Sequence, residues 1–397
     1  MSASVAVRKV ESKAEFNTFL TFPWTLYKGN SYWVPPLVSM QRDKLNKQKN
    51  PTWKHLTGDY FVAWRGAKPV GTIAAFVNHR HNEFHGEKMG FFGLFEVYDD
   101  QEAANALLQT AADYVRALGA DALRGPASFS TNEECGVLIE GFDDPPVVVY
   151  PYNPPYYQYL IERAPGFAKV MDTYAYRFTL QGAQSAEKLQ KLFRVIHKNN
   201  ERRHITVRPP DTKHLKQEFV GLKDIYNKAW EKNWGFVPFS EEELDDLVKN
   251  LGLYFDPRIT LFAEVSGEPA AFVLAIPDMN QALHYAYPRP GKPDIISKLQ
   301  VVWFWKVRRR KITRIRIPFM GVKEGYRGIG AETGMLANLF ERALKLAPKM
   351  GWEYADGGWV LETNEPMIRM CEAYNGEVYK RFRLYERALT DSNVQNG

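Results

Sequence analysis

The stretch IRIPFMGVKEGYRGIGAETGML runs from Ile315 to Leu336 and decides how the second half of the chain folds. It begins with alternation of Ile315, Ile317 and Phe319 with Arg314, Arg316 and Pro318, and this pattern is typical of a strand with one buried face. A turn with three glycines follows at 325–330, and apolar residues then recur at helical spacing from Ala331 onward. The stretch therefore predicts a strand, a glycine turn and a helix in that order.

This order of elements is suited to binding a phosphate group. Glycines let backbone N–H groups turn toward a ligand without interference from a Cβ atom, and a helix N-terminus offers unpaired donors and the positive end of its dipole. The loop lacks the Gly-Lys-Ser/Thr ending of a Walker A sequence, and GYRGIG at 325–330 is not the G-x-G-x-x-G of dinucleotide folds. Neither common nucleotide motif fits, so a different phosphate ligand is expected.

The loop resembles motif A of the GNAT superfamily of acyl-CoA N-acyltransferases, in which Gln/Arg-x-x-Gly-x-Gly/Ala holds the pyrophosphate of coenzyme A on backbone amides. Arg327 and Gly330 match this motif, but Glu332 stands where a second small residue is usual, and a carboxylate there would crowd the pyrophosphate. The resemblance implies acyl-CoA as a co-substrate and no permanently bound cofactor. It assigns coenzyme A binding to Gly321, Val322, Tyr326, Arg327, Gly328, Ile329, Gly330, Ala331 and Asn364.

The residues after this helix continue the same pattern. We expect a strand at 359–361, a helix capped by Asn364 with Pro366 in its first turn, and a final alternating strand at 378–385. This order matches the GNAT core through its motif B. The resemblance covers residues 312–386 well and the remainder of the chain less specifically.

The first half repeats this architecture without the loop. A strand at 91–97 precedes a helix at 101–118, but the turn between them, Tyr98-Asp99-Asp100, puts negative charge where a pyrophosphate needs positive potential. We therefore expect an α/β (α+β) fold of two tandem GNAT-like domains, each a mixed twisted sheet flanked by helices. Residues 1–185 would lack a phosphate loop and form the acceptor side, and residues 186–397 would bind acyl-CoA.

An irregular, aromatic segment of the first half is the candidate for binding the acceptor. Long loops in compact domains are commonly functional, so Asn132, Glu133 and Glu134, together with tyrosines that include Tyr156, are expected to form an acceptor-binding wall. The alternative is a packed structural loop. Asn132-Glu133, Gly136, Gly141-Phe142-Asp143 and Pro145-Pro146 are similar to the corresponding segment of the bacterial ceramide synthase family, which acylates long-chain sphingoid bases.

The GNAT resemblance implies that an amine attacks the thioester directly while the acyl group lies between two splayed parallel strands. The backbone N–H near Gly321 or Val322 is the candidate donor to the thioester oxygen, because preset donors stabilise a developing oxyanion. Glu362 is the first candidate for the base that takes the amine proton, and Asp278 is the second. Either carboxylate can instead be a capping or surface group.

An acid is also needed for the leaving thiolate. Many GNAT enzymes use a tyrosine seven residues after the motif B Asn, but that position here is Cys371. Tyr374 and Tyr385 are the substitutes that the sequence offers.

Residues 298–311 have the composition of an interfacial helix. Trp303 and Trp305 suit the acyl boundary of a membrane, and a basic run at 308–311 suits anionic headgroups. We therefore consider peripheral contact with the inner membrane face. The alternative is a core helix with a solvated basic end.

Composition sets the broad class. Hydrophobic content of 45% with 25% charged residues is typical of a globular protein, and net charge of +6 favours an anionic ligand without selecting one. With Cys135 and Cys371 as its cysteines and no signal peptide, the chain is expected in the cytoplasm. His79, His81 and His85 lack the carboxylate or cysteine spacing of a metal site, so a polar strand end is expected there and no metal.

Two other functions stay open. One is a Fem-like peptidyltransferase that takes its acyl group from aminoacyl-tRNA, although an intact coenzyme A loop argues against a nucleic-acid partner. The other is a non-catalytic module that binds a ligand or a membrane surface. The leading prediction is an acyl-CoA-dependent N-acyltransferase that acts on a primary amine, with a long-chain lipid amine and a small amine or peptide as the alternative acceptors.

Overall fold

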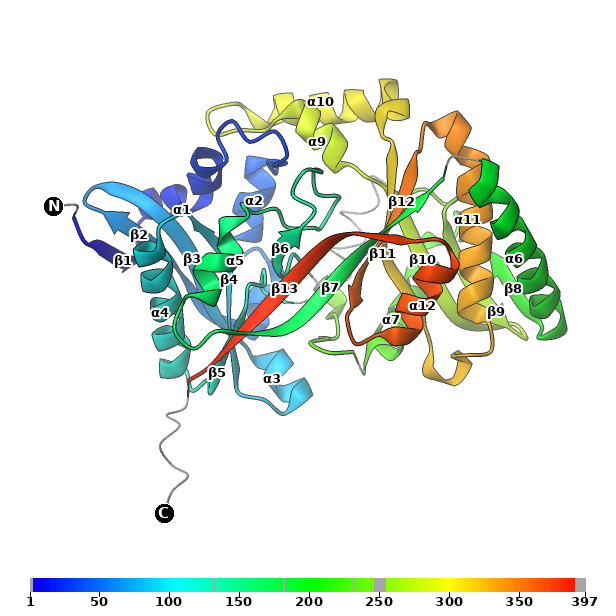
Figure 1. Ribbon diagram of the computed structural model, residues 1–397, viewed down its shortest axis with the longest axis horizontal. Coiled ribbons are helices and arrows are strands. Elements are labelled where there is room, and N and C mark those ends of the chain that lie inside the picture. The colour runs from blue at the N-terminus through cyan, green and yellow to red at the C-terminus, as the bar shows by residue number, and fades with distance from the viewer. Residues whose placement is uncertain are drawn as a thin grey trace, which may run out of the picture. The chain divides into compact units, whose positions relative to one another are not determined.

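A computed structural model of the chain describes residues 3–130, 133–180, 183–231, 233–243, 245 and 255–389. The chain forms two compact units, whose elements are drawn in Figure 1. Unit 1 comprises Met1–Thr173, Leu283–Gln300 and Lys380–Gly397, and unit 2 comprises Tyr174–Ala282 and Val301–Tyr379. The first unit thus ends earlier in the chain than residue 185, and two later segments join it.

Unit 1 is built on a mixed sheet. β1 (Val5–Lys9), β2 (Leu56–Arg65), β3 (Lys68–Asn78) and β4 (Met89–Val97) pair antiparallel in this order, and β4 pairs parallel with β5 (Ala122–Gly125). β5 and β6 (Val137–Glu140) each pair antiparallel with the end of β13 (Glu377–Ala388). β7 (Ala168–Thr179) begins in unit 1 and continues into unit 2.

Helices cover both faces of this sheet. The apolar face of α4 (Gln101–Ala117) packs on one side, and Asp100 caps this helix by accepting the Ala103 N–H at 3.1 Å. α1 (Lys13–Leu26) contributes Phe19 and Leu20 to the core on the other side. The segment expected as a polar strand end is instead the short helix α3 (His79–His85). The remaining helices of this part are α2 (Val38–Lys44), the 3-10 turn η1 (Pro51–His55) and α5 (Tyr156–Glu162).

Unit 2 repeats the same order of strand pairings. β8 (Ile205–Arg208), β9 (Thr260–Val265), β10 (Glu268–Pro277) and β11 (Arg314–Val322) pair antiparallel, and β11 pairs parallel with β12 (Tyr354–Leu361). In each unit three antiparallel pairings are thus followed by a parallel one. The expected α/β architecture of two units, each a mixed sheet flanked by helices, is confirmed.

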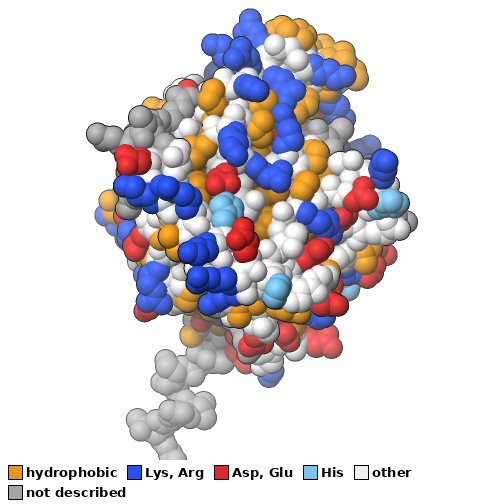
Figure 2. All heavy atoms as spheres, turned by 90° about the vertical axis from the view of Figure 1, so that its right-hand side faces the viewer, with side chains coloured by type: hydrophobic (Ala, Val, Ile, Leu, Met, Phe, Trp, Pro, Cys, Tyr) orange, Lys and Arg blue, Asp and Glu red, His pale blue; other side chains and the backbone are white. Residues whose placement is uncertain are grey.

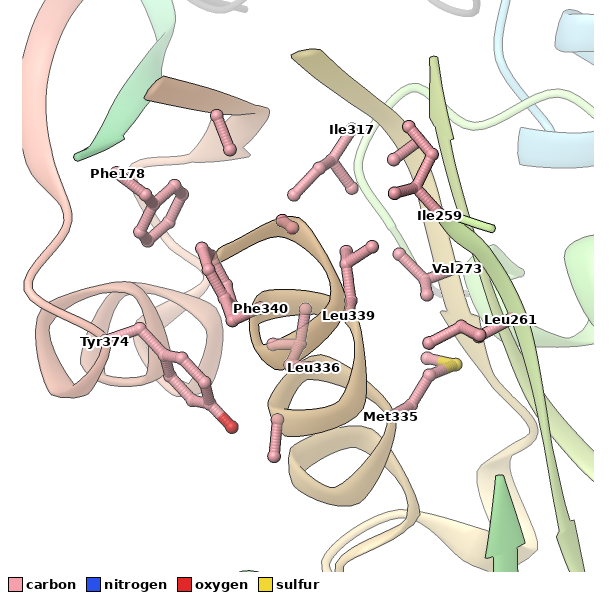
Figure 3. Packing of buried hydrophobic residues seen from close by; sticks show 14 of the residues in the cluster. Phe178, Ile259, Leu261, Val273, Ile317, Met335, Leu336, Leu339, Phe340 and Tyr374 are labelled. Carbon is pink, nitrogen blue, oxygen red and sulfur yellow. The ribbon is translucent and has the colours of Figure 1, made fainter. Parts of the chain in front are cut away.

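The core of unit 2 is organised by α11 (Ala331–Met350), the helix expected after the glycine turn. Figure 3 shows Met335 and Leu339 on the side of this helix that faces Leu261 and Val273, while Phe340 lies toward Phe178 and Tyr374. α6 (Ala183–Arg202) lies beside α11 (Figure 1). The other elements here are α7 (Leu215–Trp230), η2 (Arg309–Lys311), η3 (Glu324–Tyr326) and α12 (Glu365–Ala373), while α9 (Asn280–Ala286) and α10 (Asp294–Val307) each begin in one unit and end in the other.

β11 is buried on both faces, whereas its alternating sequence predicted one buried face. Arg314 is 6% exposed and Arg316 only 1%. Each arginine is compensated by a buried carboxylate, since Arg316 forms an ion pair with Asp356 of β12 and Nε of Arg314 lies 3.3 Å from Oδ2 of Asp278. The alternation was therefore misleading because a strand in the interior of a sheet can bury charges that are paired.

Candidate active site

The parallel strands β11 and β12 separate before they end. Their register runs from Arg314 opposite Tyr354 to Ile317 opposite Gly357, although β11 continues to Val322 and β12 to Leu361. The next residue of β11 is Pro318, which has no N–H to give to a ladder. The carboxyl ends of the two strands are thus left without regular pairing to each other, which is where an inserted ligand can hydrogen-bond the backbone.

At this end of β11, the backbone N–H of Val322 faces β12. The N–H of Lys323, just after β11, donates to the carbonyl of Ala270 in β10 at 2.9 Å. Because alternate amides of a strand face the same side, the N–H of Gly321 also faces β10 and that of Val322 faces the opposite side. Gly321 also has no room for a side chain, since a Cβ there would lie 2.9 Å from Cβ of Ala229. Of the two amides considered from the sequence, Val322 is the one with the required direction.

The glycine turn leads into the open N-terminal end of α11. Gly328 has φ +74° and Gly330 has φ +99°, which L side chains rarely adopt. The backbone ladder of α11 begins with the bond from Gly334 N–H to the Gly330 carbonyl at 2.9 Å, so the N–H groups of the preceding helical residues point out of the helix end. This is the arrangement that binds phosphate groups at helix N-termini.

Two arginines fix the turn. The guanidinium of Arg327 donates to the carbonyl of Ala229 near the end of α7, and that of Arg203 donates to the carbonyl of Ile329. The ring of Tyr326 packs against the core of unit 2. Arg327, expected to contact coenzyme A, therefore also ties the loop to the body of its unit.

Exposed cations lie along α6, and Arg203, which follows this helix, contacts the turn. Figure 2 shows Lys and Arg side chains interspersed with hydrophobic ones on the face turned toward the viewer. Arg203, just beyond α6, places Nη1 3.7 Å from the position that a Cβ on Gly330 would take. These cations favour an anionic ligand at the loop. The exposed cations of α6 are Lys191, Arg194, Lys198 and Arg202.

Glu332 reaches back into the loop. Its Oε1 accepts a hydrogen bond of 3.0 Å from the N–H of Gly328. Its Oε2 is buried and has no hydrogen-bond partner among the residues that the structure describes. The carboxylate thus lies on one of the amides that the resemblance assigned to pyrophosphate.

Asn364 and Glu362 lie where β12 passes into α12. The side chain of Asn364 accepts the N–H of Met367 at 3.3 Å, which makes it the helix cap that the sequence predicted. Glu362 lies half-buried in the turn just before it. The structure therefore places the candidate base at the carboxyl end of β12, the strand parallel to β11.

Tyr374 is brought to the first turn of α11. Its hydroxyl donates to the carbonyl of Thr333 at 2.9 Å, and its ring lies against Phe193 and Phe340 (Figure 3). Burial raises the pKa of Tyr374 above its usual value, so the group keeps its proton. Burial also raises the pKa of Cys371 to about 12, which keeps that side chain a thiol.

Tyr385 and Asp278 have other surroundings. Tyr385 belongs to the core of unit 1, where its hydroxyl donates to Oε1 of Glu162 at 3.0 Å, while the loop belongs to unit 2. Asp278 is fully buried beside Arg314 and its backbone N–H donates to the carbonyl of the same arginine at 2.9 Å. Asp278 is thus held in its contacts with Arg314, and Tyr385 is part of a different unit from the loop.

Glu133, Glu134 and Tyr156, which are expected to bind the acceptor, lie in unit 1. Asn132 is outside the described residues, and Asp278, a further candidate for the acceptor side, belongs to unit 2. Glu133 and Glu134 share Nζ of Lys44, at 3.3 and 3.1 Å. The hydroxyl of Tyr156 donates to the carbonyl of Val97 at 2.9 Å. The sequence had no signal that these two glutamates share the single ammonium group of Lys44.

The sequence also missed a buried cluster of charge and aromatic rings in unit 2. Besides its ion pair with Arg316, Asp356 accepts the hydroxyl of Tyr379 at 2.6 Å. The guanidinium of Arg177 lies 4.5 Å from the ring centres of both Tyr354 and Tyr379. The available signal was the presence of Arg316 and Asp356 inside strands, where unpaired charges are rare.

No helix among the described residues has both the length and the apolar character needed to cross a membrane.

The chain was compared with known proteins. No protein-family model matches it. It is 31% identical over 389 residues to protein YghO of Escherichia coli (strain K12), a match that covers 96% of this chain and 95% of the relative. It is likewise 31% identical over 393 residues to the bacterial ceramide synthase of Caulobacter vibrioides (strain NA1000 / CB15N), with 98% of each protein covered. A solved tandem GNAT protein from the clavulanic acid biosynthesis pathway has the same fold, with a TM-score of 0.51, 11% identity and coverage of 98% of this chain and 100% of that one.

Proposed function

Because the chain belongs to the tandem GNAT family that includes bacterial ceramide synthase, we propose that it transfers an acyl group from acyl-coenzyme A to the primary amine of a long-chain lipid base. Family membership supports acyl transfer in general. The observation that carries the choice of coenzyme A is the turn at Gly328 and Gly330, with its outward amides at the start of α11 and basic groups beside it. A pyrophosphate is the part of acyl-CoA that such a turn binds.

The remaining groups of unit 2 support each step of a direct transfer. The thioester carbonyl accepts the N–H of Val322, which stabilises the oxyanion as the amine attacks. Glu362 takes the proton that the amine loses, and the C–S bond breaks as the carbonyl re-forms. The departing thiolate receives a proton from Tyr374, whose hydroxyl already lies at the first turn of α11.

The exposed face of α10 supports a lipid acceptor. Six apolar side chains along this helix are between 41% and 66% exposed, so the alternative of a core helix does not account for them. A basic segment, 308–311, follows directly. An amphipathic surface of this kind binds anionic lipid headgroups with its cations and the acyl boundary with its apolar side chains. We propose that α10 docks on the inner membrane face, and the six side chains are Ile295, Ile296, Leu299, Val302, Trp303 and Val307.

The test is a calorimetric titration of the full chain and its Gly330→Trp variant with coenzyme A, acetyl-CoA and palmitoyl-CoA, the last below its micelle concentration. A tryptophan at this backbone conformation blocks the approach of a pyrophosphate, so binding is expected to disappear. Gly66→Trp is the matched control, because Gly66 also has positive φ (+63°) and lies in the β2–β3 hairpin of unit 1. Circular dichroism checks that both variants fold.

The three ligands separate the functions. Since each buried CH₂ contributes about 0.8 kcal/mol, a long-chain site should bind palmitoyl-CoA far more tightly than acetyl-CoA. Equal affinities would indicate a small-acyl transferase. No binding of any ligand by the wild-type chain would overturn the proposal and favour a tRNA-dependent or a non-catalytic function.

A further inference from the structure

Unit 1 contains a carboxylate that has no cation beside it. Oε2 of Glu96, in β4, accepts hydrogen bonds from the hydroxyls of Tyr27 and Tyr157, both at 2.7 Å. Both tyrosines are 2% exposed. In the described part of the chain, these donors are neutral and no ion pair includes Glu96. Glu96 is half-buried, and partial desolvation of a carboxylate without a cationic partner is unfavourable, so this group needs an explanation.

The strand register relates Glu96 to the candidate acyl site of unit 2. β4 and β11 hold the same place in their sheets, each between an antiparallel and a parallel neighbour and each leading to a long helix. β4 ends at Val97 and β11 at Val322. Glu96 therefore occupies in unit 1 the place that Gly321 has in unit 2.

The backbone amides confirm this correspondence. The N–H of Val97 points away from β3 and donates to the hydroxyl of Tyr157 at 2.9 Å. The equivalent N–H in unit 2 is that of Val322, which we assign to the thioester oxygen. In unit 1 a tyrosine hydroxyl therefore occupies the amide that an acyl carbonyl would use, and a carboxylate replaces the glycine.

The surroundings of Glu96 carry an excess of negative charge. Glu133 and Glu134 share one ammonium group, that of Lys44. Burial is the main cause that raises the pKa of Glu96 to about 7, and the negative charge of Glu134 also raises it. Lys44 is already shared by two carboxylates, so a further cation is needed for charge balance when Glu96 ionises.

We propose that this place in unit 1 is a binding site for an organic ammonium ion, with Glu96 as its anionic partner. The aromatic groups select this class of ligand. The ring of Tyr27 stacks on that of Trp33 at a centroid distance of 4.9 Å, and aromatic rings attract alkylammonium groups. A hard metal ion would instead require several oxygen ligands around it. The inference concerns unit 1 alone and stands whether or not unit 2 uses acyl-CoA.

The test is a titration of the full chain with octylamine at about pH 8, where Glu96 is ionised and the amine is still protonated. Octanol is the neutral analogue, and it corrects for binding of the alkyl chain to apolar surfaces. The wild-type protein is expected to bind octylammonium at least about tenfold more tightly than octanol, as one charge-assisted contact provides. Glu96→Gln should abolish that preference.

Glu140→Gln is the control, because Glu140 is an acidic residue of unit 1 whose side chain is 57% exposed. This variant should keep the wild-type preference. Tyr27→Phe is a second probe, which removes one hydroxyl from Glu96 and should weaken octylammonium binding without abolishing it. An equal affinity for octylamine and octanol in the wild type, or an unchanged preference in a folded Glu96→Gln protein, would overturn the inference.

Discussion

The N–H of Gly328 donates to the carboxylate of Glu332 across 3.0 Å, so the candidate phosphate loop already holds an anion of its own. The other carboxylate oxygen is buried and lacks a hydrogen-bond partner among the described residues. A pyrophosphate that enters the loop must take this amide from Glu332 and must approach its negative charge. We therefore predict that Glu332 competes with coenzyme A for the loop.

Replacing Glu332 with Gln should strengthen binding of coenzyme A. The amide side chain keeps the size of the original but removes one negative charge near the pyrophosphate, and like charges about 4 Å apart repel by about 1–4 kcal/mol near a protein surface. We expect the dissociation constant to fall by about tenfold in a calorimetric titration. Glu341→Gln, in the same helix and beside His197 at 3.0 Å, changes net charge equally and should have little effect. A weaker affinity in Glu332→Gln would mean that the carboxylate assists binding.

Replacing Glu362 with Gln should slow the reaction without preventing acyl-CoA binding. Loss of a general base lowers turnover by about 10²–10⁴-fold, whereas the pyrophosphate contacts lie on the loop of α11. Release of free thiol measures turnover, and titration with acyl-CoA measures affinity. Glu365→Gln is the control, because Glu365 is exposed and pairs with Arg369 at 3.2 Å. Wild-type turnover in Glu362→Gln would exclude this residue as the base.

Polar replacements on α10 should weaken membrane binding. Leu299 and Trp303 are 61% and 41% exposed, and each apolar side chain that enters a membrane contributes about 1.5–3 kcal/mol. Replacing both with Ser should lower co-sedimentation with anionic phosphatidylglycerol vesicles by more than about tenfold. Val220→Ser on α7, where Val220 is 65% exposed, controls for a general loss of apolar surface. Equal sedimentation of all three proteins would exclude α10 as the docking surface.

Glu96 should make the stability of the protein depend on pH. Burial raises its pKa to about 7 in the folded chain, from a usual value of 4.5. A raised pKa means that its contribution to stability is fully present below pH 4.5 and is lost as pH rises through about 7. Relative to Glu96→Gln, the free energy of unfolding of the wild type should fall by at most about 3 kcal/mol across this range. Denaturant unfolding at several pH values measures it, and a difference that is constant with pH would contradict the assignment.

Removing the carboxylate of Asp356 should destabilise unit 2. Asp356→Ala leaves the buried guanidinium of Arg316 without its ion pair, which lowers the free energy of unfolding by about 3–5 kcal/mol. Replacing both residues, with Leu at 356 and Met at 316, should recover much of this loss because neither charge remains buried. Glu187→Ala, which removes an exposed ion pair with Lys191, should change stability by less than about 1 kcal/mol. Chemical denaturation of the three variants measures these changes in the free energy of unfolding.

The local features of the site could be predicted because their causes are local. The glycines of 325–330 required a turn, the apolar spacing after Ala331 required a helix, and Asn364 was identified as a cap from its position before Pro366. The pairing of Arg316 with Asp356 could not be predicted, since it joins strands that are separated by α11 in the chain. The position of Tyr385 in unit 1 depends on how the last strand pairs, and its sequence carries no information on that pairing.

The sequence by itself determined most of the longer strands and helices, the glycine turn and the helix caps, because hydrogen bonds and hydrophobic spacing within a few residues decide them. Only the tertiary structure decided which charges are buried and what accompanies them. Glu96, Tyr27 and Tyr157 come from β4, the end of α1 and α5, and they meet only when the sheet of unit 1 has formed. The physical reason is that burial and electrostatic pairing depend on neighbours in space, and for these residues the neighbours are far apart in the chain.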